Sequence, residues 1–466
     1  MVFDKKFRSI LFCCLFLIPA MTWAEAERES CKVCGMWIDQ YQRTAVEMVY
    51  SDGKTEHACG VACMFRIVHE KGLDSFRSIR VNDWNTGAKV NAQNAWYSLG
   101  SRLIPDMLPN YIAFADQQSG EAFAAKEGGV VLSFINAMDT ISPRGMTQPF
   151  RIRQAVTPGA GSFGIGLAYA YVMKDRLKIG TDGQDPDSFI SGNPAQPRAP
   201  KQIDIQTQML VMNYGITDRV AFQMNLPYFE KEMETLVRQG NQINTVTSEN
   251  DGLGDITFEF RYNPWRSHYY DKFFTLLAGA TLPTGDFDAT RAYNAALKTN
   301  LISTGPGMQL GSGIPTVLGG LLYSQRLGHF WLHAQALYRY FPENRDDYKF
   351  GDETQAGLAI HYTPNYDMVL GIEMDASYTD ENEDLGIKIG NTGGTRANLA
   401  LVFDWRFLNA FGGNMNLRGS VGLPVYEDLN SQDFLNAGGK KFTQSQLGEG
   451  FFANLVINFN TRFGDF

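Results

Sequence analysis

From Ser162 onward, apolar residues alternate with small or polar residues at every second position. In the stretch DITFEFRYN, for example, Ile256, Phe258 and Phe260 are separated by polar residues. Successive side chains of a strand point to opposite faces of a sheet, so this alternation predicts strands with one apolar and one polar face. Twelve such segments begin near residues 163, 203, 220, 256, 273, 316, 330, 354, 368, 397, 416 and 452.

The connections between these segments alternate in length. Short ones include GITD, RLGH and TPNY, and long ones include GTDGQDPDSFISGNPAQPRAPK and RQGNQINTVTSEND. Short turns at one end and long polar loops at the other are typical of outer-membrane β-barrels. We therefore predict an all-β antiparallel transmembrane barrel of about 12 strands over residues 162–466, ending on the aromatic Phe466. A soluble all-β domain is the alternative.

The chain before the barrel has a different pattern, in which strand and helix signals follow one another. A predicted strand at 45–50 is followed by a helix at 60–71, which ends at Gly72. A strand at 111–115 and a helix at 120–126 repeat the arrangement. Residues 27–138 thus form a predicted α+β domain with two strand-turn-helix repeats. Residues 139–161 contain three Pro and three Gly and are expected to be a linker.

The N-terminus has the pattern of a secretory signal peptide, predicted to span residues 1–26. Lys5, Lys6 and Arg8 precede an apolar run at 10–21, and Ala24-Glu25-Ala26 offers a cleavage site. The run is too short to span a bilayer comfortably. Cys13 and Cys14 would be removed with the signal. The net charge of −9 argues against nucleic acid as a partner.

Four cysteines remain in the mature chain, as C-x2-C and C-x3-C pairs: Cys31, Cys34, Cys59 and Cys63. The second pair is spaced to share a face at the start of the first predicted helix. Met36 adds soft sulfur and His57 stands just before the second pair. Soft donors in a secreted domain favour Cu(I). Two disulfides, a redox pair or a structural zinc site remain alternatives on spacing alone.

Several stretches of the first domain resemble one known family. CKVCGMWIDQY, DGKTEHACGVACMF, VNDWNTGAKVNAQNAWYSLGS and MLPNYIAFAD are similar to the NosL family, copper-binding accessory proteins of nitrous oxide reductase assembly. The resemblance covers about residues 30–137 and implies Cu(I) binding on a two-repeat α+β fold. By position, it implies Cys31, Cys34, Met36 and Met107 as ligands. Cys59 and Cys63 fall where the family often has one cysteine or none.

The chain departs from that family in lacking a lipidation motif before Cys31 and in carrying a barrel. The barrel can replace a lipid as the anchor, but it puts a nitrous oxide role in doubt. Two barrel stretches, GLGDITFEFRYNPW and LPTGDFD, loosely resemble outer-membrane channels of the phenol-degradation MetA-pathway type.

Two barrel histidines, His333 and His361, fall on the inward faces of neighbouring predicted strands and could form a metal relay or a plain polar lining. No catalytic motif is visible, so we expect no enzyme. The sequence predicts an outer-membrane barrel with a periplasmic Cu(I)-binding domain. It would act in copper transport across the outer membrane, or in copper hand-off there to periplasmic copper proteins. A channel for small organic molecules with a redox or structural thiol domain, and a copper chaperone merely anchored by the barrel, are the alternatives.

Overall fold

The computed structural model describes residues 28–294, 299–436 and 438–463. The predicted signal peptide, its two cysteines and the terminal Phe466 lie outside the described residues. Within the described ranges, no helix is both long and apolar enough to cross a membrane. The chain divides into two compact units: among the described residues, the first contains 28–139 and Leu408–Asn414, and the second contains Thr140–Phe407 and Met415–Phe463.

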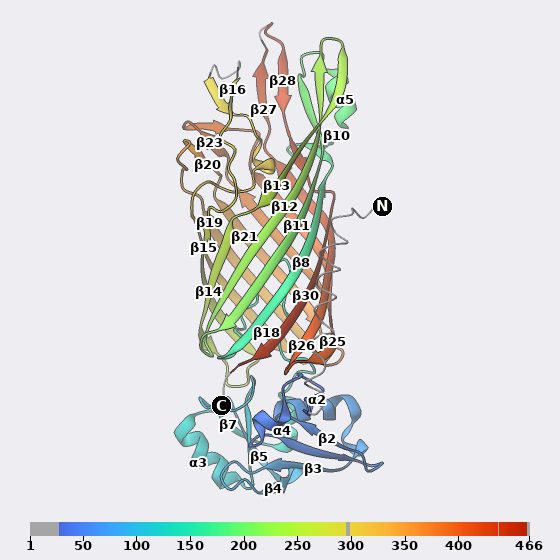
Figure 1. Cartoon of the computed structure of the whole chain (residues 1–466), viewed down its shortest axis with the longest axis vertical. Helices are drawn as coiled ribbons and strands as arrows, with labels where there is room; N and C mark the ends of the chain where they lie inside the picture. Colours follow the sequence, from blue (N-terminus) through green and yellow to red (C-terminus); the bar gives the residue numbers. More distant parts are fainter. Residues whose placement is uncertain (1–27, 295–298, 437, 464–466) are drawn as a thin grey trace. The chain divides into compact units, whose positions relative to one another are not determined.

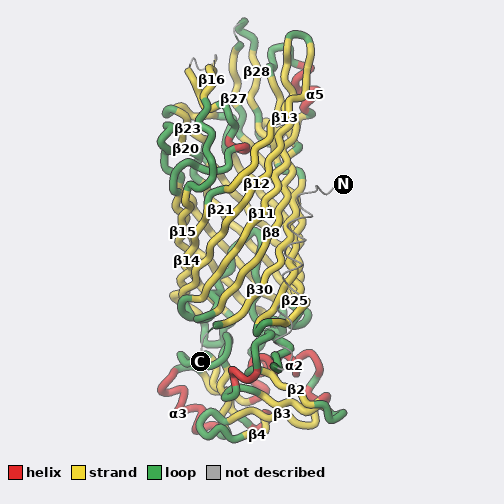
Figure 2. The backbone as a smooth tube through the Cα atoms, in the orientation of Figure 1, coloured by secondary structure: helices red, strands yellow, loops and turns green. Residues whose placement is uncertain are grey.

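The first unit contains two small antiparallel sheets with helices between their strands (Figure 2). One sheet has the order β2-β1-β3-β4 and the other has the order β6-β5-β7. This is the α+β domain that the sequence predicts. The strands are β1 (Val46–Tyr50), β2 (Thr55–Ala58), β3 (Phe76–Asn82), β4 (Lys89–Asn91), β5 (Trp96–Leu99), β6 (Tyr111–Phe114) and β7 (Val130–Ser133). The helices are η2 (Ile38–Tyr41), α2 (Val61–Lys71), η3 (Leu73–Ser75), η4 (Ala92–Asn94), α3 (Gln117–Glu127) and α4 (Phe134–Asp139).

Helix α2 is the centre of this unit because its first two turns are almost wholly apolar. Every residue from Val61 to Val68 is buried, and the helix ends at Gly72, whose φ of +81° suits glycine. Phe65 makes edge contacts with two aromatic rings of the second sheet, Tyr97 and Tyr111, at 5.4 Å between ring centres. The helix therefore packs on the second sheet while its N-terminus follows directly from β2 of the first.

Twelve strands of the second unit form a closed antiparallel barrel, as predicted (Figure 1). Strand β11 pairs with both β8 and β12, which closes the sheet. Each strand begins within a few residues of the position that the alternation predicts. The barrel strands are β8 (Ser162–Lys174), β11 (Arg198–Gly215), β12 (Val220–Gln239), β14 (Ile256–Arg266), β15 (Lys272–Leu282), β18 (Thr316–Leu327), β19 (Phe330–Tyr340), β21 (Glu353–Tyr362), β22 (Met368–Thr379), β25 (Gly394–Ala410), β26 (Gly413–Leu429) and β30 (Phe451–Arg462).

The two faces of the barrel wall differ in the way an outer-membrane protein requires. On β14, Phe260 and Tyr262 are each 49% exposed, whereas the alternating Glu259 and Arg261 are 0% and 5% exposed. The apolar face is thus the outer one and the polar face lines the lumen. A soluble sandwich would show the opposite arrangement, so this burial pattern supports a lipid-facing exterior.

Short turns lie at one end of the barrel, for example 216–219 and 328–329, and long connections lie at the other. The long connections carry a small hydrophobic core that includes Leu177, Ile190 and Leu236. Their elements are β9 (Arg176–Ile179), β10 (Asp182–Gln184), α5 (Pro186–Gly192), β13 (Gln242–Leu253), β16 (Arg291–Asn294), β17 (Thr299–Ile302), η5 (Pro306–Met308), β20 (Tyr348–Lys349), β23 (Asn382–Asp384), β24 (Ile387–Ile389), β27 (Gln432–Leu435), β28 (Lys441–Gln444) and β29 (Gln446–Gly448).

Residues 140–161, which we call the lumen loop, enter the barrel and leave it at the same end. The carbonyl of Thr140 accepts a hydrogen bond from Arg326, beside the short turn 328–329. The amide of Gly161 donates to the carbonyl of Gly215, beside the short turn 216–219, at 2.9 Å. Between these points the loop forms hydrogen bonds with side chains of seven barrel strands: β14, β15, β18, β19, β22, β25 and β26. The sequence leads us to expect a linker here; the segment joins the two units but is packed inside the barrel.

Three ion pairs fix the lumen loop to the barrel wall. Arg144 pairs with Asp404 at 2.7 Å, Arg151 with Asp375 at 2.6 Å, and Arg153 with Glu259 at 2.6 Å. The backbone amides of Phe150 and Arg151 also donate to the buried carboxylate of Glu373. A polar lumen can accommodate such a loop because each buried charge meets an opposite one. The contacts explain how a segment without regular secondary structure keeps one position.

Candidate metal centre

The first two cysteines are brought together by a tight loop at residues 31–36. The amide of Cys31 donates to the carbonyl of Met36 at 2.8 Å, and the amide of Gly35 donates to the carbonyl of Cys31 at 2.7 Å. Gly35 has a φ of +79°, which a residue with a side chain rarely adopts. The C-x2-C-G pattern therefore folds back on itself and turns Cys31 and Cys34 toward the same side.

The second two cysteines lie on either side of the start of α2. Cys59 follows β2, and Cys63 lies in the first turn of the helix. The sequence predicts both cysteines at the start of the helix; α2 begins at Val61, so Cys59 lies just before the helix and does not share a helix face with Cys63. Gly60 between them leaves room for Asp106, since an added Cβ would lie 1.8 Å from its Oδ2. The close approach of the 106–107 segment thus depends on this glycine.

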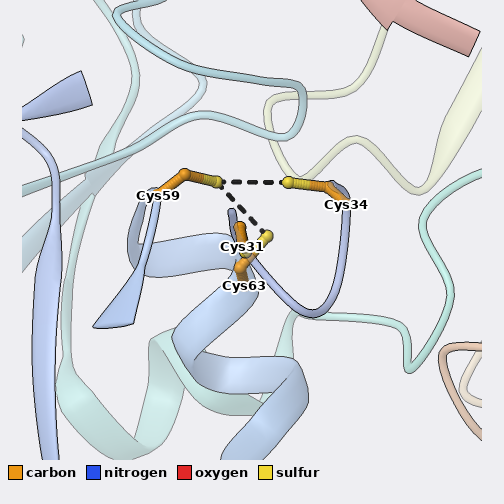
Figure 3. A group of neighbouring side chains, drawn as sticks. All are labelled: Cys31, Cys34, Cys59 and Cys63. Atoms are coloured by element: carbon orange, nitrogen blue, oxygen red, sulfur yellow. Dashed lines mark hydrogen bonds between the residues drawn. The ribbon is translucent and has the colours of Figure 1, made fainter. Parts of the chain in front are cut away.

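The four thiols form one cluster (Figure 3). Their sulfur atoms all lie within 4.8 Å of one another, with Cys34 Sγ 3.3 Å from Cys59 Sγ, and Cys59 Sγ 3.7 Å from Cys63 Sγ. A disulfide needs about 2.05 Å, so these are free thiols in this structure. Four cysteine sulfur atoms this close together can bind one soft metal ion once they are deprotonated.

Met107 adds a fifth sulfur atom to the buried cluster. The Sδ of Met107 accepts a hydrogen bond from Cys63 Sγ at 3.6 Å. Three of the cysteines are 0% exposed, and Cys34 is 7% exposed. The structure therefore brings together the four cysteines that the spacing singles out and the methionine that the NosL resemblance implies. The residues present fit a thiophilic metal ion such as Cu(I).

The thiols of the cluster differ in their pKa values. Hydrogen bonds from Cys34, and then from Cys59 and Cys63, hold the pKa of the Cys31 thiol well below its usual value. The hydrogen bond to Cys31 raises the pKa of the Cys59 thiol well above its usual value. A hydrogen bond to Cys31 also raises the pKa of the Cys63 thiol well above its usual value. Cys31 is therefore a stronger acid than Cys59 and Cys63, so it gives up its proton to a cation more readily than they do.

Sequence reasoning did not single out Arg66. Its Nη1 lies 3.7 Å from the sulfur of Met107, and the residue is only 5% exposed. Arg66 stands three residues after Cys63, so both are on one face of α2. That spacing is the signal that could have revealed it. A buried guanidinium beside the cluster favours negative charge there.

The other predicted ligands of the first unit have different surroundings. Met36 ends the loop that carries Cys31 and is buried, at 6% exposed. His57 is not part of the metal-binding group found among the described residues. Its Nδ1 lies 2.9 Å from a carboxylate oxygen of Glu29 in an exposed pair. The cluster thus depends on sulfur alone.

The two predicted lumenal histidines do lie together, with ring centres 5.1 Å apart. Both nitrogens of His333 are already hydrogen-bonded, Nε2 to Thr147 and Nδ1 to Ser324, each at 2.8 Å. His361 Nε2 lies 3.1 Å from Glu373. These contacts join the lumen loop to the wall and favour a polar lining over the relay, because a metal ion would have to replace them.

Comparison with family models divides the chain in the same place as the fold does. Residues 192–428, half of the chain, match the family model described as "Putative MetA-pathway of phenol degradation". The chain belongs to this family. Residues 23–141 match a second family model, NosL. This MetA-pathway family member therefore carries a NosL domain before its barrel. No curated protein sequence matches the chain.

Solved structures resemble the two parts separately. A copper chaperone NosL from Shewanella denitrificans is 23% identical, covers 25% of this chain and 95% of its own, and has a TM-score of 0.22. An outer membrane channel from Pseudomonas putida F1 is 13% identical, covers 68% of this chain and 100% of its own, and has a TM-score of 0.47. The toluene transporter TodX of P. putida is 10% identical, covers 66% and 91%, and has a TM-score of 0.34.

Proposed function

We propose that this MetA-pathway family member is an outer-membrane protein whose N-terminal domain binds Cu(I) in the periplasm and hands it to periplasmic copper proteins. The observation that carries the proposal is the buried cluster of Cys31, Cys34, Cys59 and Cys63, with Met107 beside it. Five sulfur donors and no oxygen donor in the group favour a soft ion over a hard one. The NosL match over residues 23–141 supports copper rather than zinc as that ion.

The contents of the barrel lumen favour transfer of copper to periplasmic proteins over passage of copper through the barrel. The lumen loop occupies the interior and is held by three ion pairs. The only paired histidines in the described part of the lumen are engaged in hydrogen bonds. Copper would therefore be bound and released by the N-terminal domain, while the barrel supplies the membrane anchor.

The barrel topology supports a periplasmic position for the domain. The lumen loop begins and ends at the end with the short turns, where Thr140 and Gly161 both lie. In outer-membrane barrels the short turns face the periplasm and the long loops face outward. The chain that precedes Thr140 would thus emerge on the periplasmic side.

A pair of epitope tags tests this topology. A tag inserted near Asp185, in the long connection between β8 and β11, should be bound by antibody on intact cells. A tag at Glu29 should become accessible only after the outer membrane is permeabilised. The matched measurement is whole-cell antibody labelling before and after that treatment. If the Glu29 tag were labelled on intact cells, the domain would act as a surface copper scavenger and the hand-off would have to be abandoned.

A second candidate function is a channel for small organic molecules, and the family description of the barrel region favours it. Uptake of copper and of a small organic anion such as benzoate into liposomes that contain the full-length protein separates the two, because the channel predicts benzoate accumulation above that of empty liposomes. Hand-off without transport predicts no copper accumulation above that of empty liposomes, and Cu(I) transfer from the protein to a soluble chelator. Copper accumulation inside the liposomes would instead support transport across the membrane.

A further inference from the structure

The four thiols of the cluster differ in how far solvent can reach them. Cys34 is 7% exposed, whereas the other three cysteines are each 0% exposed. A dissolved ion or a small oxidant therefore meets the sulfur atom of Cys34 before it meets the others. The first reaction of the reduced cluster with a solute should thus take place at Cys34.

Cys34 and Cys59 are the pair best placed to form a disulfide. Their sulfur atoms are 3.3 Å apart and face one another from two different segments (Figure 3). A disulfide bond is about 2.05 Å long, so the two atoms need to approach by only about 1.3 Å. Cys59 lies before α2, which begins at Val61, so the helix does not fix its backbone. Cys63 is in the first turn of α2, and its Sγ lies 3.7 Å from that of Cys59.

Charge in the cluster also favours the loss of two thiolates. One Cu(I) ion bound to four thiolates would leave three negative charges among sulfur atoms that lie within 4.8 Å of one another. The guanidinium of Arg66, 3.7 Å from the sulfur of Met107, offsets only part of this charge. Like charges that are buried together disfavour one another. A neutral disulfide removes two of these charges, so oxidation of one pair of thiols relieves the repulsion.

The expected destination of this domain supplies an oxidant. The predicted signal peptide directs the domain to a compartment in which disulfides persist. Copper in an oxidising medium is present largely as Cu(II), whereas a donor set of sulfur atoms is suited to Cu(I). Copper that arrives as Cu(II) must therefore gain an electron before it matches this site.

We propose that the cluster reduces Cu(II) in addition to binding Cu(I), an inference that rests on the copper function proposed for the same site. Cys34 and Cys59 each lose a proton and give up one electron, and a bond forms between their sulfur atoms. The two electrons convert two Cu(II) ions to two Cu(I) ions, and the two protons go to solvent. Two electrons and two protons from a dithiol reductant restore the thiols.

Oxidation also weakens the hold of the cluster on copper. The disulfide sulfur atoms carry no negative charge, so Cys31, Cys63 and Met107 are the donors of the cluster that remain. The oxidised cluster should therefore bind Cu(I) less tightly than the reduced cluster, by about a hundredfold or more. The step that produces Cu(I) thus also favours its transfer to an acceptor protein.

Anaerobic titration of the reduced, full-length protein in detergent with Cu(II) sulfate tests the inference. The electron paramagnetic resonance signal of Cu(II) should stay absent for the first two equivalents, because both ions are reduced. Over the same range, the number of free thiols in the mature chain should fall from four to two. Peptide mass spectrometry should then find a disulfide between Cys34 and Cys59. A full Cu(II) signal from the first equivalent, or a disulfide between another pair of cysteines, would overturn the proposal.

Two variants assign the reaction to the exposed thiol. Cys34→Ser should slow the loss of the Cu(II) signal by about tenfold or more, because the remaining thiols are 0% exposed. The matched control is His57→Gln, since His57 pairs with Glu29 at the surface and is not part of the cluster. Its rate should equal that of the unmodified protein. Equal rates in the two variants would contradict reaction at Cys34, and the disulfide found in the unmodified protein does not depend on how either variant folds.

A parallel titration with Cu(I) separates this inference from the proposed function. Cu(I) binding by the reduced protein, together with an undiminished Cu(II) signal in the first titration, would overturn the reduction and leave the copper site in place. Absence of Cu(I) binding would overturn both. After two equivalents of Cu(II), a coloured Cu(I) chelator should remove the copper at a concentration about a hundredfold lower than the reduced protein requires. Equal affinity in the two states would contradict the link between oxidation and release.

Discussion

Replacing Cys31 or Cys34 by serine is expected to abolish Cu(I) retention by the full-length protein. Each change removes one thiolate from a cluster whose sulfur atoms lie within 4.8 Å of one another. A serine hydroxyl is a hard and weakly acidic donor, so it does not replace the lost bond to a soft ion. We expect the affinity for Cu(I) to fall by more than about a hundredfold, beyond the loss typical of residues that only orient a ligand. Competition with a coloured Cu(I) chelator measures the affinity of each variant for Cu(I).

The double variant Cys13→Ser and Cys14→Ser is the control for this experiment. Both residues belong to the predicted signal peptide, so copper retention should equal that of the unmodified protein. Mass spectrometry of the mature chain tests separately whether the segment with Cys13 and Cys14 is removed. Full copper affinity in Cys31→Ser would show that the cluster is not the copper site.

Neutralising the lumen loop is expected to raise the ionic conductance of the barrel severalfold. In the triple variant Arg144→Gln, Arg151→Gln and Arg153→Gln, Asp375 and the 0% exposed Glu259 lose their arginine partners. Asp404 loses Arg144 and keeps only Arg418, at 3.5 Å. Breaking a buried pair from one side costs about 3–5 kcal/mol. Leaving the lumen lets water solvate these carboxylates, so the loop should spend more time outside the lumen. Single-channel recording in planar bilayers measures the change.

An exposed ion pair provides the control. Lys201→Gln breaks the ion pair between Lys201 and Glu234, in which both side chains are more than a third exposed. Such exposed pairs contribute little to stability. Its conductance should match that of the unmodified barrel. If the folded triple variant had the same conductance as the unmodified barrel, the lumen loop would not be what closes the barrel.

The barrel could be predicted from the sequence because its physical requirement is local. A strand between lipid and a polar lumen must alternate, and this period is visible in any ten residues, as in the run from Ile256 to Arg266. Likewise the helix at 61–71 was predicted nearly to its ends by its apolar face and by Gly72.

The lumen loop could not be recognised in the same way. Its Pro and Gly content is that of an exposed linker, and its partners are far away in the sequence, as with Arg144 and Asp404. Only the three arginines in an otherwise apolar and small segment hint at buried acidic partners. The same distance in sequence hid the roles of His333 and Thr147.

The metal centre was predicted in part. Cysteine spacing singled out the four thiols but left disulfides, zinc and copper as alternatives, because spacing does not fix the distances between sulfur atoms. The structure gives those distances and holds the four sulfur atoms together as free thiols. Met107 lies 44 residues from Cys63 and followed only from the family resemblance.

Metal competition on the reduced, full-length protein tests the central claim most directly. The protein is offered equal amounts of Cu(I) and Zn(II) without oxygen, and the bound metal is then quantified by mass spectrometry. We predict about one bound Cu(I) per chain and displacement of zinc, because the donor set consists of sulfur alone. Stoichiometric zinc with no preference for copper, or all four cysteines in unreactive disulfides after gentle purification, would contradict the account.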